Sequence, residues 1–136
     1  MKAQLQQEWY SVEQCQMNVD KLYIFGDNTI GKGLGGQAQI RNCRNSFGIP
    51  TKMFPDMEEG SFFEDNQEPI DYIDDALIRL KKLLEISEYK IVIFPSDGLG
   101  TGLAQFDVRC PDAFNYLNVK INELFKQKIY EVDEWN

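Results

Sequence analysis

Two helices are the clearest elements in the pattern of apolar and polar positions along the chain. Residues 69–87 carry Ile70, Ile73, Leu77, Leu80 and Leu84 at successive spacings of 3, 4, 3 and 4, which places them on one helix face. Residues 111–128 repeat this spacing with Phe114, Leu117, Ile121 and Leu124. Both segments open on a proline, which suits the first helical position. The pattern predicts two amphipathic helices over these ranges.

Three short apolar runs have the β-branched and aromatic composition of strands. Residues 21–26 (KLYIFG) and 90–94 (KIVIF) are nearly continuous in apolar character, which is typical of strands buried on both faces. Residues 47–53 predict a further strand, and Pro50 places it at a sheet edge or a strand end.

The remaining segments give weaker patterns. The Gln-rich residues 1–20 are compatible with a first strand, and 36–46 predict a short helix that starts near Gly36. Residues 54–68 read as a loop, and the tail 129–136 as a short closing strand.

The order of elements predicts an α/β fold with three layers (α/β/α) and a mostly parallel sheet. A length of 136 residues suits one domain, spanning 1–136. The chain contains no apolar stretch of membrane-span length and no signal-peptide pattern. We therefore expect a cytoplasmic protein, in the host cytoplasm if viral, with no membrane partner.

Composition narrows the chemistry. The three cysteines are widely spaced without a CxxC pair, so they predict neither a disulfide framework nor a zinc site. Histidine is absent, which removes the usual general base and the commonest metal ligand. Any catalysis must use carboxylates, amides, backbone dipoles or substrate-assisted water, and we expect no metal.

The net charge of −8 argues against direct binding to nucleic acid. The charge is uneven, however. Residues 26–52 have a balance of +3, whereas 53–75 hold nine acidic residues and no basic one.

Glycines concentrate in two loops that each follow a predicted strand. Five glycines lie within 26–36 and three within 96–103. The carboxyl ends of parallel strands meet at one edge of the sheet, so both loops can converge on one crevice. Exposed backbone amides and a following helix N-terminus form an anion cradle, and a pyrophosphate suits two facing loops. The segment GKGLGG (31–36) matches G-x-G-x-x-G, but a single match is little evidence for a dinucleotide, and we expect no cofactor.

The motifs FGDN…GGQA and DGLGTGLAQF resemble the two ligand loops of macrodomains, which bind ADP-ribose. The resemblance is closest to small bacterial and phage macro-like proteins and covers about residues 20–125. It implies that Asn28 binds the distal ribose, while the glycines of both loops enclose the diphosphate. The adenine-recognition residue stays unassigned. The ligand-binding set on this basis is Gly26, Gly33, Gly35, Gly36, Gln37, Gly98, Leu99, Gly100, Thr101 and Gly102.

The candidate catalytic residues are Asn28, Asp27, Asp97 and Lys32, which are the polar and charged groups of these loops. Each also has a structural interpretation. Aspartates beside glycine turns often bond backbone amides, and a loop lysine can simply face solvent. The candidates for stacking on adenine, with core packing as the alternative, are Phe47, Phe54, Phe62 and Phe63.

Three functional hypotheses follow. The first is a macro-like module that binds ADP-ribose or a related nucleotide diphosphate, with or without hydrolysis of ADP-ribose from a target or derivative. The second is a noncatalytic nucleotide sensor. The third is an interaction protein whose acidic residues 56–75 imitate nucleic-acid charge toward an unidentified protein partner.

Overall fold

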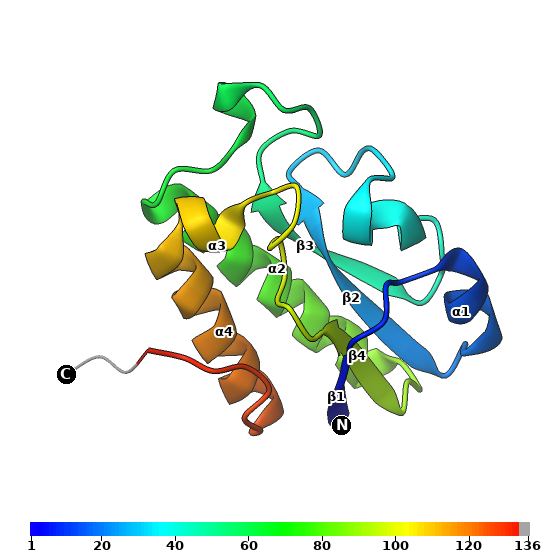
Figure 1. Ribbon diagram of the computed structural model, residues 1–136. Coiled ribbons are helices and arrows are strands. Elements are labelled where there is room, and N and C mark those ends of the chain that lie inside the picture. The colour runs from blue at the N-terminus through cyan, green and yellow to red at the C-terminus, as the bar shows by residue number, and fades with distance from the viewer. Residues whose placement is uncertain (134–136) are drawn as a thin grey trace.

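The computed structural model describes residues 1–133 and contains one parallel four-stranded sheet with helices on both faces (Figure 1). The strand order is β1-β4-β2-β3, and every neighbouring pair is parallel. This is the predicted three-layer α/β arrangement. The strands are β1 (Lys2–Gln6), β2 (Lys21–Asn28), β3 (Ser46–Lys52) and β4 (Ile91–Pro95).

The two long helices confirm the pattern of apolar residues. Helix α2 runs over Gln67–Ile86 and α4 over Pro111–Phe125. Asn66 caps α2 by accepting a hydrogen bond from the amide of Glu68 at 3.0 Å, so the helix begins two residues before Pro69. Helix α4 ends where Lys126 adopts a left-handed conformation, with φ +52°.

Several local predictions are wrong. The segment after the first glycine loop forms only a 3-10 helix, η1 (Gly36–Ile40), instead of a helix to residue 46. Three short elements had no clear pattern: α1 (Val12–Met17), η2 (Glu59–Ser61) and α3 (Phe106–Arg109). The predicted closing strand is absent from residues 129–133, and its last three residues lie outside the described part.

Side chains of the two central strands alternate between two cores. Leu22 and Ile24 of β2 pack with α2 and α4, and so do Val92 and Phe94 of β4. The intervening Tyr23, Phe25 and Ile93 face the other layer, where Tyr10, Cys15 and Ile40 cover them. Because both faces of the central strands are buried, their sequences are continuously apolar.

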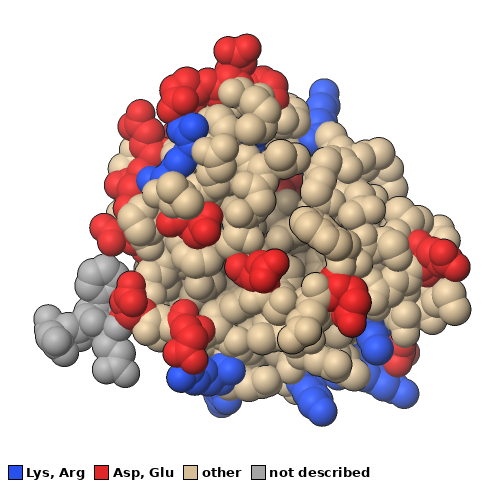
Figure 2. Space-filling model, viewed as in Figure 1, with Lys and Arg blue, Asp and Glu red and all other residues tan. Residues whose placement is uncertain are grey.

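Acidic side chains gather over the loop between β3 and α2, at the top of the molecule in the shared view of Figures 1 and 2. Several of them bond their own chain. Glu59 pairs with Arg109 at 2.6 Å, and Asp65 accepts hydrogen bonds from the amides of Asp112 and Ala113 at the start of α4. Among residues 1–133, no helix has the combination of length and apolar composition needed to cross a bilayer.

Candidate functional site

A cleft of about 560 Å³ lies at the carboxyl ends of all four strands. The last residue of each strand lines the cleft: these residues are Gln6 of β1, Asn28 of β2, Lys52 of β3 and Pro95 of β4. The chain leaves β2 toward η1 on one face and leaves β4 toward α3 and α4 on the other (Figure 1). The cleft is therefore at the topological switch point, where open α/β sheets bind ligands.

The cleft exists because β2 and β4 separate before they end. Their pairing extends only from Lys21 with Ile91 to Tyr23 with Ile93. Beyond this point the Tyr10 hydroxyl lies 2.7 Å from the carbonyl oxygen of Ile24 and 3.3 Å from that of Ile93. Burial raises the pKa of Tyr10 far above its ordinary value, so the hydroxyl stays a hydrogen-bond donor. Tyr10 thus satisfies carbonyls that would otherwise lose their partners in the sheet.

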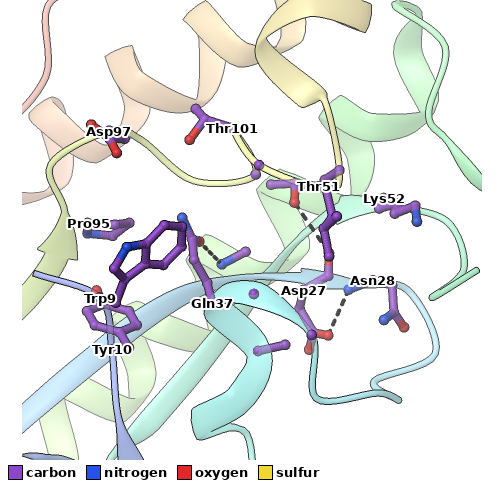
Figure 3. Close-up of a pocket in the computed structure, with 18 of the residues that line it drawn as sticks. Trp9, Tyr10, Asp27, Asn28, Gln37, Thr51, Lys52, Pro95, Asp97 and Thr101 are labelled. Carbon is purple, nitrogen blue, oxygen red and sulfur yellow. Dashed lines mark hydrogen bonds between the residues drawn. The ribbon is translucent and has the colours of Figure 1, made fainter. Parts of the chain in front are cut away.

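Gln37 closes the gap between the separated strands (Figure 3). Its side-chain oxygen accepts a hydrogen bond from the amide of Gly26 at 2.8 Å, and its side-chain nitrogen donates to the carbonyl of Gly98 at 3.0 Å. Both ends of this predicted ligand-binding side chain are thereby engaged. Gln37 joins the end of β2 to the second glycine loop and forms part of the floor of the cleft.

A polar network fixes the first glycine loop. The side-chain amide of Asn28 donates to the carbonyl of Lys32 at 2.7 Å and accepts from its amide at 3.3 Å. Arg41 pairs with Asp27 at 2.7 Å and donates to the carbonyls of Lys32 and Gly33 at 3.2 and 3.0 Å. Asp27 and Asn28 are placed in the cleft as predicted, but their side chains are bonded to their own loop.

The second glycine loop is pressed against the end of the sheet. A Cβ added to Gly100 would lie 2.5 Å from the Cβ of Thr51, and Gly100 has φ +75°. Leu99 is fully buried in the core, and Gly98 is backed by the ring of Phe114. Of the predicted ligand-binding residues, Gly98 and Leu99 therefore do not line the cleft, because they anchor the loop from behind.

The two glycine loops line the same cleft. Within residues 1–133, the amides of Gly33 to Gly36 have no hydrogen-bond acceptor, and neither do those of Gly100 to Gly102. Leu103 of the second loop reaches across the cleft, and its Cδ1 lies 3.4 Å from where a Cβ of Gly35 would be. The loops therefore face each other, which is the convergence that the order of elements predicts. The predicted residues that line the cleft are Gly26, Asp27, Asn28, Lys32, Gly33, Gly35, Gly36, Gln37, Asp97, Gly100, Thr101 and Gly102.

The remaining lining residues were not identified from the sequence. Trp9 follows β1, Thr51 and Lys52 end β3, and Ser96 follows β4. The sequence offers a signal for Thr51, Lys52 and Ser96, because residues that end or follow a predicted strand share the edge of the sheet with the glycine loops. It offers none for Trp9. The four phenylalanines considered for stacking on adenine are absent from the described lining.

Lys52 is the buried cation of the cleft lining, at 6% exposure. Its ammonium donates to the carbonyl of Asp56, lies 4.6 Å from the centre of the Phe62 ring, and has no carboxylate partner within residues 1–133. Desolvation lowers the pKa of Lys52, and the nearby Asp56 offsets part of this effect. The Lys52 ammonium is therefore held by groups of the loop between β3 and α2.

Comparison with known proteins gives one match. Neither the curated proteins nor the solved structures contain a match to this chain. Residues 5–120 match the model of a family of unknown function, DUF7831, and this range includes both glycine loops and all four strands except the start of β1. The chain therefore belongs to the DUF7831 family.

Proposed function

We propose that the cleft binds ADP-ribose or a related nucleotide diphosphate, with the diphosphate held between the two glycine loops. The observation that carries this proposal is that two glycine loops line one cleft from opposite sides, and that the amides of Gly33 to Gly36 and Gly100 to Gly102 have no acceptor within residues 1–133. Consecutive backbone amides of this kind bind anions, and two facing runs suit two linked phosphates.

The dimensions of the cleft fit such a ligand. The cleft reaches from the end of β1 to the end of β3, and three paired inter-strand spacings would amount to about 14 Å, which the separation of β2 from β4 increases. Its volume of about 560 Å³ lies in the usual range for small-molecule sites. Both values suit an extended nucleotide with groups on either side of its phosphates.

The charges at the β2–β3 end support an anionic ligand. Lys32 and Lys52 line this end, and the carboxylate of Asp27 is paired with Arg41. Neither lysine has a carboxylate partner within the described chain. Lys32 belongs to the first loop itself, so its charge would attract phosphate there.

Binding is better supported than hydrolysis. Asp27 and Asn28 are committed to fixing the first loop, so neither is free to activate water. Asp97 is the lining carboxylate after β4, and it makes no hydrogen bond or ion pair with a side chain in residues 1–133. If the protein hydrolyses ADP-ribose derivatives, Asp97 is the residue that we assign to the reaction.

The acidic-surface hypothesis has less support. Asp65 accepts a hydrogen bond from the amide of Asp112 at the start of α4, and Asp74 accepts one from the hydroxyl of Tyr116. Glu59 forms an ion pair with Arg109. These carboxylates stabilise the chain itself. We place the binding activity in the cytoplasm, since the three free thiols of Cys15, Cys43 and Cys110 suit a reducing compartment.

Isothermal calorimetry with ADP-ribose, ADP and AMP tests the proposal. We expect ADP-ribose and ADP to bind more tightly than AMP, because only they carry the second phosphate. The variant Lys32→Gln should weaken ADP binding about 3- to 10-fold, whereas Lys81→Gln on the exposed face of α2 should leave it unchanged. Equal affinity for all three nucleotides, or no heat of binding with any of them, would refute the diphosphate site.

A further inference from the structure

Trp9 is an exposed aromatic residue on a segment that hydrogen bonds hold in place. Its side chain is 79% exposed, and yet it lines the cleft beside Pro95 (Figure 3). An indole ring left in water at a cleft wall offers a large flat surface that a planar group can cover. The residues that follow β1 therefore supply a surface that the glycine loops lack.

The segment that carries Trp9 is held on both sides. The side-chain amides of Gln6 and Gln14 bond each other twice at 2.9 Å, and Gln6 also donates to the carbonyl of Glu8 at 3.1 Å. The next residue, Tyr10, is buried and bonded to the β2 backbone. The backbone of Trp9 is thus fixed before any ligand arrives, which lowers the entropy cost of stacking on it.

The charges of the cleft differ between its two ends. Glu8 and Asp97 line the β1–β4 end, and no lysine or arginine is among the described lining residues there. Lys32 and Lys52 line the opposite end. Carboxylates repel phosphates but accept hydrogen bonds from amino groups. The end that holds Trp9 therefore suits an uncharged aromatic group with amino donors.

We propose that Trp9 is the stacking platform for the aromatic base of the ligand, and that this base carries an amino group facing Glu8 and Asp97. The inference rests on the proposed function and fixes the direction of the ligand. The base lies over the ends of β1 and β4, the diphosphate between the glycine loops, and the distal group at the end of β2 and β3.

Tryptophan fluorescence tests this directly, because the chain has two tryptophans, Trp9 and Trp135. Trp135 lies outside the described residues, and Trp135→Phe makes Trp9 the single tryptophan. ADP-ribose should quench its emission in a saturable manner. Pyrophosphate, which has no base, should bind without quenching.

Calorimetry on the otherwise unaltered chain gives an independent measurement. Trp9→Ala should weaken ADP-ribose binding about 5- to 100-fold, as expected for the loss of one stacked base. Trp9→Phe should recover most of the affinity, and pyrophosphate should bind both variants as it binds the parent. An ADP-ribose analogue with hypoxanthine, which has a carbonyl in place of the adenine amine, should bind about tenfold more weakly.

The outcomes separate the two proposals. If pyrophosphate and ADP-ribose both fail to bind the parent chain, the proposed function is wrong. If ADP-ribose binds but neither quenches Trp9 nor responds to Trp9→Ala, the diphosphate site stands and the base platform is overturned. Equal affinity for the adenine and hypoxanthine forms overturns the amino-group assignment.

Discussion

The close contact of the second glycine loop with β3 makes Gly100→Ala a sharp test of how the cleft is built. The added methyl group would lie 2.5 Å from both Cβ and Oγ1 of Thr51, at a residue with φ +75°. A left-handed conformation costs a non-glycine residue about 1–2 kcal/mol. Overpacking by one methyl group against a fixed neighbour adds about 1–3 kcal/mol. We therefore expect Gly100→Ala to lower the free energy of unfolding by about 3 kcal/mol.

Gly102→Ala is the matched control in the same loop. A Cβ at Gly102 meets no described atom within 4 Å, and the residue is not among the glycines with positive φ. Its free energy of unfolding should change by less than about 1 kcal/mol, with any gain coming from lower entropy of the unfolded chain. Both substitutions remove a glycine from the lining, so they differ mainly in steric conflict.

Urea denaturation followed by circular dichroism measures both variants. The midpoint should fall for Gly100→Ala at an unchanged m-value, and its Tm should drop by about 10 °C. Equal stability of the two variants would refute the reasoning. It would mean that the loop moves away from Thr51 at little cost, and that the cleft is not a rigid feature of the fold.

Three further predictions concern the polar groups around the cleft. Arg41→Met should lower the free energy of unfolding by about 2–3 kcal/mol, because it leaves the largely buried Asp27 unpaired and frees the first loop. Arg44→Met, at an exposed residue, should lower it by less than about 0.5 kcal/mol, and equal urea midpoints for the two variants would contradict this. Gln37→Ala removes two side-chain hydrogen bonds, so it should lower the free energy of unfolding by about 1–3 kcal/mol. Gln39→Ala on the same 3-10 helix should lower it clearly less in the same assay. Burial raises the pKa of Tyr130 above its ordinary 10.0, so its stabilising contribution is complete below pH 10 and is lost as the pH rises further. Plotted against pH above 10, the free energy of unfolding should therefore fall less steeply for Tyr130→Phe, by up to about 1.4 kcal/mol per pH unit, and parallel slopes would show that this tyrosine does not couple to folding.

The order of elements was predictable because it depends on local pattern. The continuous apolar runs of β2 and β4 and the periodic helices α2 and α4 each carry enough apolar residues to reveal their period. Alternation of such elements fixes a parallel sheet, and a parallel sheet brings the loops after its strands to one edge. The meeting of the two glycine loops follows from that logic alone.

The first strand and the place of Trp9 in the cleft were not predictable in the same way. Strand β1 is short and buries only Ala3, so the alternation of Ala3 and Leu5 with polar residues is too brief to mark a buried face. Its place beside β4 comes from backbone pairing, from Lys2 with Ile91 to Gln6 with Pro95. Trp9 reaches the cleft through this pairing. A residue whose position depends on the register of a weakly patterned edge strand cannot be assigned to a site from sequence.

The hydrogen bonds of the polar residues beside the glycines could not be predicted from the sequence, for a different reason. A glycine-rich loop has few side chains with which to fix its own conformation, so its neighbours must supply the hydrogen bonds. Asn28 and Arg41 hold the first loop, and Gln37 ties the second loop to β2. For Asp27 and Asn28 the sequence alone leaves both a catalytic and a structural role open, because polar groups next to glycines are also what an active site contains. The structure shows which of these side chains are already bonded within the chain. A ligand that meets preformed amides loses little free energy in ordering the loops, which is the advantage that fixed donors give to any anion site. In the proposed function, the backbone of the glycine loops would bind the diphosphate and the polar side chains around it would hold that backbone in place. Selectivity for the ligand would then depend on residues at the ends of the cleft, such as Trp9 and Lys32.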